Sequence, residues 1–115
     1  MAIIVKSEGI TPETMFHMMN GKTDGLKTAV GDTFDIVECA EIEQTDINGE
    51  PVTVVFVVTD DGRVLGSNSA TVRRTFEALV ESFGLPSPFA PYKNMTVIQK
   101  KSKNDRTYLD LDFAD

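Results

Sequence analysis

The feature that most constrains this chain is an uninterrupted apolar run between two turn signals. The run spans residues 52–59 and reads VTVVFVVT. Asn48-Gly49 precedes it and Asp61-Gly62 follows it, and such pairs favour the tight hairpins that join antiparallel strands. A run of this length, rich in β-branched residues, fits a strand that is buried on both faces. We therefore expect residues 52–59 to form the central strand of a meander.

Four more strands are expected around this run. Residues 33–44 precede it, residues 63–67 follow it, and residues 95–101 and 106–113 form a last hairpin. In the first of these segments apolar and polar residues alternate, which predicts a half-buried strand. The even positions, expected to share one face, include Phe34, Ile36, Ala40 and Ile42. The odd positions, expected on the other face, include Asp35, Cys39, Glu41 and Glu43.

Two helices have recognisable start and stop signals. Thr11-Pro12-Glu13 combines a hydroxyl cap, a first-turn proline and an acid, which predicts a short helix over residues 11–20. Ser69 can cap a second helix, in which apolar residues recur every three or four positions until Gly84 ends it. Residues 21–31 carry glycines and lysines and are expected to form a loop.

The predicted order of elements after the first helix is β-β-β-α-β-β. A five-stranded meander with a helix before its final hairpin has the strand order of the OB-fold, an antiparallel barrel that often binds oligonucleotides. We expect one mainly β domain over residues 1–115, with the short N-terminal helix and loop in 1–31 and the barrel in 32–113. The chain has no apolar run long enough for a membrane span and no basic region before Ala2–Val5, which favours a cytoplasmic protein.

Charge is distributed unevenly along the chain. The formal net charge is −7, which by itself disfavours a nucleic-acid partner. Residues 32–50 contain seven acids and no Lys or Arg, so this stretch accounts for the whole imbalance. Residues 51–109 contain eight basic and five acidic side chains. The chain is therefore polarised, and its second half is the part suited to an anion.

The sequence indicates a binding protein without a cofactor, and not an enzyme. His17 is the only histidine, and no serine, cysteine or acid is arranged near it as a nucleophile and base pair. One histidine and one cysteine, Cys39, cannot complete a structural zinc site. Asp60-Asp61-Gly62 lacks the alternating acids of a calcium loop, and hairpin chemistry explains it. We expect no metal site, and we expect Cys39 to be a small buried side chain.

The last hairpin is the strongest candidate for a binding site. Four of the chain's eleven basic residues fall between residues 100 and 106, and Tyr108 has the parity opposite to Leu109 and Leu111, so its ring should face outward beside them. Proteins bind single-stranded nucleic acid with such cations and stacking rings. The same composition also suits an exposed loop that only keeps the protein soluble. The predicted nucleic-acid-binding residues are Tyr108, Lys100, Lys101, Lys103 and Arg106, with Tyr92, Lys93 and Arg63 adding a second ring and further charge.

Several short motifs extend over Gly25 to Phe113. They are Leu26-Lys27, Gly31-Asp32-Thr33, Val52-Thr53-Val54, Asp61-Gly62, Ser69-Ala70-Thr71-Val72, Lys103-Asn104 and Leu109-Asp110-Leu111. In their order and spacing the chain resembles the single-stranded DNA-binding proteins of protein-primed Bacillus phages and their relatives. The resemblance implies an OB-fold that binds and protects single strands during phage genome replication, without sequence preference and with a stacking role for Tyr108. The segment Phe83–Pro91 is an insertion relative to that pattern.

The acids raise an objection, because they would repel phosphates. They could line the face opposite the groove, or the acidic end of the chain, residues 110–115, could compete for the groove and recruit replication proteins. The alternation of Leu109, Leu111 and Phe113 instead predicts a buried strand there. The rival function is a protein-interaction or assembly module, which an edge position of residues 52–59 would favour. The sequence also leaves a homodimer open.

Overall fold

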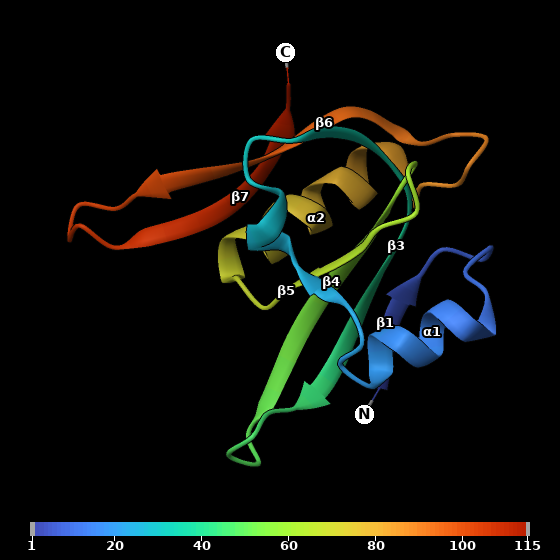
Figure 1. Cartoon of the computed structure of the whole chain (residues 1–115), viewed down its shortest axis with the longest axis horizontal. Coiled ribbons are helices and arrows are strands. Elements are labelled where there is room, and N and C mark those ends of the chain that lie inside the picture. Colours follow the sequence, from blue (N-terminus) through green and yellow to red (C-terminus); the bar gives the residue numbers. More distant parts are fainter. Residues whose placement is uncertain (1, 115) are drawn as a thin grey trace.

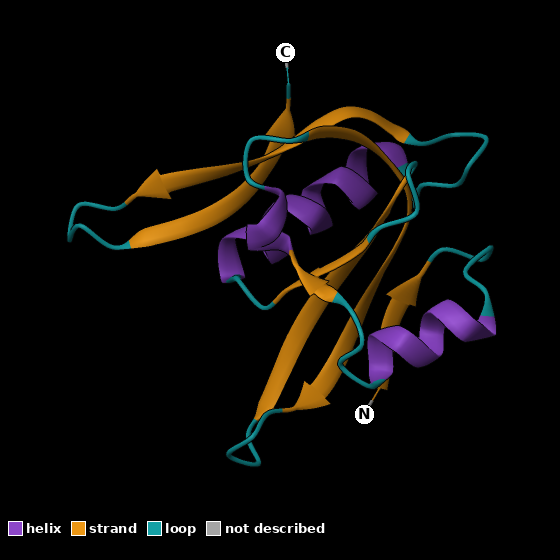
Figure 2. Ribbon diagram, in the orientation of Figure 1, coloured by secondary structure: helices purple, strands orange, loops and turns teal. Residues whose placement is uncertain are grey.

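The computed structural model describes residues 2–114, and these form a mainly β protein with seven strands and two α-helices (Figures 1 and 2). The predicted order of five strands with a helix after the third is confirmed by β3 to β7, whereas β1 and β2 were not predicted. The elements are β1 (Ala2–Lys6), α1 (Pro12–Met19), β2 (Asp24–Gly25), the 3₁₀ helix η1 (Leu26–Ala29), β3 (Thr33–Thr45), β4 (Pro51–Thr59), β5 (Val64–Ser67), α2 (Ala70–Phe83), β6 (Tyr92–Lys101) and β7 (Thr107–Phe113).

All seven strands belong to one curled sheet, in which six follow the order β2-β5-β4-β3-β6-β7 and β1 pairs with β3 outside this path. Neighbouring strands are antiparallel, except that β2 runs parallel to β5. The long strand β3 pairs with β4 on one side, while on the other its first half pairs with β6 and its second half with β1. The apolar run of residues 52–59 lies in β4, between β3 and β5, as predicted for a central strand.

The sheet is a half-barrel whose two ends do not meet. Closure of the predicted five-stranded barrel would require β5 to pair with β7, and no such pairing occurs among residues 2–114. Instead β2 lies along β5, and η1 places Leu26 and Ala29 in the core that also contains Leu65 and Leu111. Residues 21–31, which we expected to be a plain loop, therefore fill the gap between the two ends of the sheet. Two buried apolar side chains three residues apart hold this segment in place.

The side chains of β3 do not keep the predicted parity. The pairing of β3 with β4 shifts between Ile36 and Glu38, as it does at a β-bulge. As a result Cys39 is fully buried in the same core cluster as Ile36, whereas Ala40 and Ile42 belong to a second cluster on the opposite face. The prediction of a single apolar parity was wrong, because the extra residue changes which face a given parity reaches.

Each helix covers a different face of the sheet. Helix α2 packs Phe76 into the core inside the curl, and α1 packs Met18 against Phe56 on the outer face. Both predicted caps are confirmed, since the side chains of Thr11 and Ser69 accept hydrogen bonds from backbone N–H groups in the first turns. Neither helix, nor any other between residues 2 and 114, has the length and apolar character that crossing a bilayer requires.

Two buried polar side chains join the sheet to its surroundings. Glu41 on β3 is 2% exposed, and its carboxylate accepts a hydrogen bond from Arg73 Nε of α2 at 3.1 Å. Burial raises the pKa of Glu41, and Arg73 partly offsets that rise. Ser7 Oγ accepts from the Cys39 N–H at 3.0 Å and donates to the Pro86 carbonyl at 2.7 Å. This serine therefore connects the segment after β1 to both β3 and the loop before β6.

Candidate nucleic-acid interface

The second halves of β6 and β7 leave the sheet as a two-stranded extension. We call residues 98–110 the basic arm. Pairing with β3 involves only Tyr92 to Thr96 of β6, and Val97 forms a bridge with Val30, so from residue 98 onward β6 pairs only with β7 along the arm. Figure 1 shows the arm projecting at the left, separate from the β3–β4 hairpin below it. These projections leave an accessible surface of 6900 Å², against about 6,200 Å² for an average monomer of this mass.

The pairing register determines which side chains of the arm meet. Lys100 lies directly opposite Tyr108, and two positions further along the hairpin the Ser102 N–H donates to the Arg106 carbonyl at 2.8 Å. Paired residues of antiparallel strands share a face. Lys100 and Arg106 therefore lie on the same face as Tyr108, whose side chain is half-buried. Three of the predicted site residues are thus brought together.

The other two cations of the arm lie elsewhere on it. Lys101 points to the opposite face, and Lys103 lies in the exposed turn. The arm's two acids are at the limit of ion-pair range, with Asp105 at 3.9 Å from Lys101 Nζ and Asp110 at 3.8 Å from Lys100 Nζ. Such partly or fully exposed pairs contribute little to stability. The arm therefore keeps an excess of positive charge in a chain whose net charge is negative.

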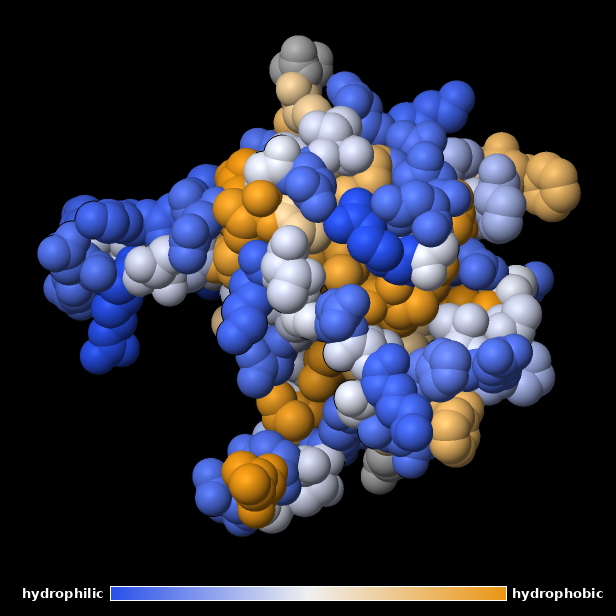
Figure 3. Space-filling model, viewed as in Figure 1, coloured by the Kyte–Doolittle hydropathy of each residue, from blue (hydrophilic) through white to orange (hydrophobic). Residues whose placement is uncertain are grey.

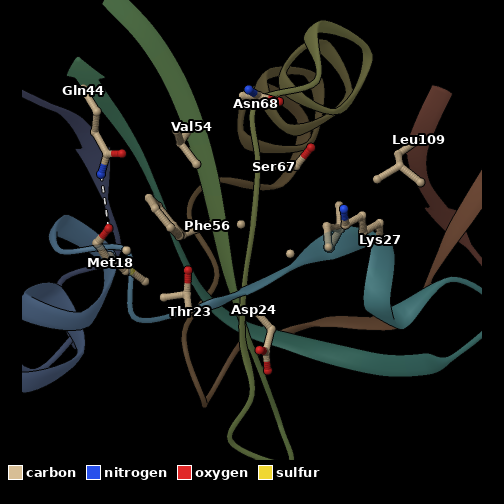
Figure 4. A pocket seen from close by; sticks show the side chains of 14 residues that line it. Met18, Thr23, Asp24, Lys27, Gln44, Val54, Phe56, Ser67, Asn68 and Leu109 are labelled. Atoms are coloured by element: carbon tan, nitrogen blue, oxygen red, sulfur yellow. Dashed lines mark hydrogen bonds between the residues drawn. The ribbon is translucent and has the colours of Figure 1, made fainter. Parts of the chain in front are cut away.

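A cleft of about 390 Å³ opens beside the base of the arm. Phe56 of β4 and Gly66 of β5 line it, and Gln44 Nε2 donates to the Met18 carbonyl at 3.1 Å at its far side, as the dashed line in Figure 4 shows. Figure 3 shows apolar surface where the hydrophilic arm joins the body. The remaining lining side chains include Thr23, Asp24, Leu26, Lys27, Val54, Ser67, Asn68 and Leu109.

Tyr108 does not face this cleft. Leu109 lines the cleft, and successive side chains of a strand point to opposite faces. The arm therefore presents two surfaces: Tyr108 with Lys100 and Arg106 on one, and Lys101 on the cleft side with Leu109. A single-stranded nucleic acid that contacts both surfaces therefore has to pass around the edge of the arm.

Tyr92 is not available for stacking, which corrects its predicted role. Its side chain is 5% exposed in the main core, and its hydroxyl donates to the Gly84 carbonyl at 2.5 Å. Burial raises the pKa of this phenol. The first residue of β6 faces inward because β6 curls over the core here, pairing with Ile36 of β3. The alternation of side chains along the sequence could not by itself predict the burial of Tyr92.

Lys93 and Arg63 also lie apart from the arm. Lys93 is exposed at the start of β6, seven residues and therefore about 23 Å along the strand from Lys100. Arg63 is held by Asp32 at 2.9 Å and by Asp61 at 3.1 Å, with its guanidinium 5.5 Å from the centre of the Phe34 ring. Arg63 is therefore already neutralised where it lies.

A group of exposed phenylalanines was not predicted from the sequence. Phe83 and Phe113 were expected to be buried, but 64% and 46% of their surfaces are exposed, and Phe89 is 99% exposed. The exposure of Phe89 could have been predicted, because this residue lies between the prolines of the Phe83–Pro91 insertion. An apolar ring in a proline-rich loop has no helix or strand to bury it.

Comparisons with protein-family models, with curated proteins and with solved structures find no match for this chain.

Proposed function

We propose that this protein binds single-stranded DNA without sequence preference, through the basic arm, and protects single strands during DNA replication. The observation that carries the proposal is the position of Tyr108 between Lys100 and Arg106 on one face of the arm. Cations attract phosphates, and an adjacent aromatic ring stacks a base of any identity. This arrangement suits an unpaired strand better than a duplex, whose bases are already stacked. A role in phage replication is what the resemblance to the phage proteins adds.

An OB-fold assignment supports this proposal. We assign β3 to β7 as its five strands, with η1 filling the gap where a barrel would close. OB-folds bind oligonucleotides on the face of their second and third strands, between the loop after the first strand and the loop after the fourth. The corresponding elements here are β4 and β5, the acidic β3–β4 hairpin and the basic arm, and of these the arm is the one through which we propose that DNA binds. The cleft lined by Phe56 and Gly66 lies on that face.

The acids of residues 32–50 are compatible with DNA binding at the arm. Glu41 is buried against Arg73, and Asp32 pairs with Arg63. The exposed remainder includes Glu43 and the β3–β4 hairpin, which projects separately from the arm (Figure 1). Charges more than about 8 Å apart in solvent are largely screened at physiological salt. Repulsion from this hairpin therefore acts mainly on a strand that approaches the hairpin itself.

The rival function is an interaction module that uses residues 52–59 as a sheet edge. β4 pairs with β3 along its length and with β5 from Val55 to Val58, so among the described residues the edge that β5 leaves unpaired is mainly the stretch before Val55. Large apolar side chains are exposed at the end of β7 and in the loop before β6, and also on β1, on α1 and at the tip of the β3–β4 hairpin.

The test is fluorescence anisotropy of a labelled oligo-dT of about 30 nucleotides, titrated at two salt concentrations. We expect binding that weakens steeply with salt and that duplex DNA of the same length does not match. Lys100→Glu with Lys101→Glu should abolish most of it. Lys6→Glu with Lys22→Glu carries the same charge change on the N-terminal segment and should bind nearly as the parent does. No binding at low salt, or equal loss in both double variants, would refute the arm as the interface.

A further inference from the structure

The β3–β4 hairpin is a second projection, and its charge is opposite to that of the arm. Among the described residues β1 pairs with β3 only as far as Glu43, and β5 pairs with β4 only from Val55 onward, so the strands of the hairpin between them pair only with each other. We call residues 43–53 the acidic hairpin. It contains no Lys or Arg, and none of its acids forms an ion pair in the part of the chain that the structure describes. These acids are Glu43, Asp46 and Glu50.

The turn of the acidic hairpin is held in shape and exposes an apolar side chain. The Asp46 N–H donates to the Glu50 carbonyl at 2.8 Å, and Asp46 Oδ1 accepts from the N–H groups of Asn48 and Glu50 at 2.8 and 2.9 Å. Ile47 is 99% exposed, and Figure 3 shows apolar surface at the tip of this hydrophilic projection. The alternation of side chains places Asp46 and Glu50 on one face of the hairpin and Glu43 on the other. One face of the tip therefore combines an apolar side chain with two acids.

The face of the basic arm that carries Tyr108 has the complementary pattern. Its half-buried ring lies between Lys100 and Arg106, which are both exposed. Asp110 shares this face, but it is only 15% exposed and lies at the base of the arm, where it accepts a hydrogen bond from Thr75 of α2 at 2.5 Å. Arg106 forms no ion pair within the described residues. The outer part of this face therefore offers a ring and an unpaired cation, the counterparts of an apolar tip with acids.

A chain's own hairpin does not cover its own arm. Within residues 2–114 no ion pair joins the two projections, and Figure 1 shows them apart, the arm at the left and the hairpin at the bottom. A second copy of the chain supplies the partner, because each copy carries both projections and a two-fold axis lets two copies exchange them. The net charge of −7 on each copy opposes their approach. At about 0.1 M salt that repulsion is screened beyond roughly 10 Å, whereas groups in contact still attract.

We propose that the acidic hairpin of one copy docks on the Tyr108 face of another copy's basic arm, so that self-association and DNA binding exclude each other. Ile47 packs against the Tyr108 ring, and Glu50 meets Arg106. These arm residues are the ones to which we assign a base and its phosphates, so the exclusion rests on the proposed function, whereas the docking does not. Exposed ion pairs contribute little each, so the association is weak. Concentrated protein without DNA then has covered arms, and single-stranded DNA uncovers them.

Sedimentation velocity without DNA, at about 50 mM salt and about 10 to 500 µM protein, tests the docking. We expect reversible self-association that about 500 mM salt abolishes. Glu50→Lys should weaken it at least about tenfold, because like charges then meet. Glu43→Lys is the matched control, since it makes the same charge change on the opposite face of the same hairpin, and it should leave the association nearly unchanged. Unchanged thermal midpoints establish that the variants are folded.

Charge exchange identifies the partner of the hairpin. Arg106→Glu should weaken the association as Glu50→Lys does, and the two substitutions in one chain should restore it. Ile47→Ser should weaken it about fivefold, because the apolar contact is lost. A wild type that stays monomeric throughout, or a Glu50→Lys variant that associates as the wild type does, overturns the docking.

Oligo-dT of about 8 nucleotides, short enough for a single arm, tests the exclusion. We expect it to dissociate the wild-type assembly, and an oligonucleotide that binds without doing so overturns the exclusion. DNA binding itself is measured by anisotropy at protein concentrations below those of self-association, where the arms are uncovered. Association that depends on Glu50 in a protein that binds no oligo-dT would uphold the docking and refute the DNA-binding proposal, so the two failures are distinguishable.

Discussion

The ring of Phe56 lies over the α-carbon of Gly66, its pairing partner across β4 and β5. A β-carbon at residue 66 would be 2.8 Å from Phe56 Cε1, which is closer than van der Waals contact allows. We expect Gly66→Ala to lower the free energy of unfolding by about 1–3 kcal/mol, measured by urea denaturation, because the ring has to move. Gly25→Ala, on the adjoining strand, meets only Lys27 Cγ at 3.6 Å and should cost less. Equal costs would show that the ring moves freely.

Tyr108 should contribute to affinity through its ring rather than its hydroxyl. We expect Tyr108→Ala to weaken oligo-dT binding by about 1–3 kcal/mol, roughly 5- to 150-fold, because one stacked base is lost. Tyr108→Phe should bind nearly as the wild type does. Anisotropy titrations measure both, with the thermal midpoint as the control for folding. An alanine variant that binds normally would remove Tyr108 from the interface.

Ser7 should be important for stability although it lies outside any regular element. Ser7→Ala leaves the Cys39 N–H and the Pro86 carbonyl without their buried partner, so the free energy of unfolding should fall by about 1–3 kcal/mol. Ser82→Ala, at an exposed position of α2, should have almost no effect. Chemical denaturation of the two variants gives the comparison, and similar values for both would contradict the assigned role of Ser7.

Cys39 should be inert in the folded protein and should make the fold sensitive to alkali. Burial raises the pKa of its thiol from 9.0 to about 12. At pH 8 a thiol reagent should therefore react only after unfolding. Because the folded state favours the neutral thiol, its contribution to stability is present below pH 9 and is lost as the pH rises toward 12. The free energy of unfolding should fall less steeply over that range in Cys39→Ala, and identical slopes would contradict the assignment.

The strands and helices from residue 33 onward could be predicted because their signals are local. The Asn48-Gly49 and Asp61-Gly62 turns, the Ser69 cap and the alternation near Leu109 each depend on neighbours in sequence. β1 could not be predicted in this way, since Ala2–Val5 lacks alternation and its strand character comes from pairing with β3. The bulge after Ile36 was equally hidden, because a register shift is a property of two strands together.

The candidate site could be predicted where the alternation of side chains along a strand was enough to place a residue on one face. Across a regular hairpin, parity placed Tyr108, Lys100 and Arg106 correctly relative to one another. It failed for Tyr92, whose burial depends on how β6 curls over α2 and β3. The exposed ring of Phe89 was missed for the complementary reason, since composition indicates that a segment is a loop but not which of its side chains remains uncovered.

The N-terminal segment that fills the gap in the half-barrel has a consequence for how the chain is made. Leu26 and Ala29 leave the ribosome early, yet the core they enter includes Val97 and Leu111, near the other end of the chain. β1 likewise cannot pair until β3 has been synthesised. Contacts of such long sequence separation form late because a large loop has to close first. A nascent chain that stops before β7 therefore lacks part of the core into which Leu26 and Ala29 pack, and the last hairpin to be synthesised is the one that completes this core.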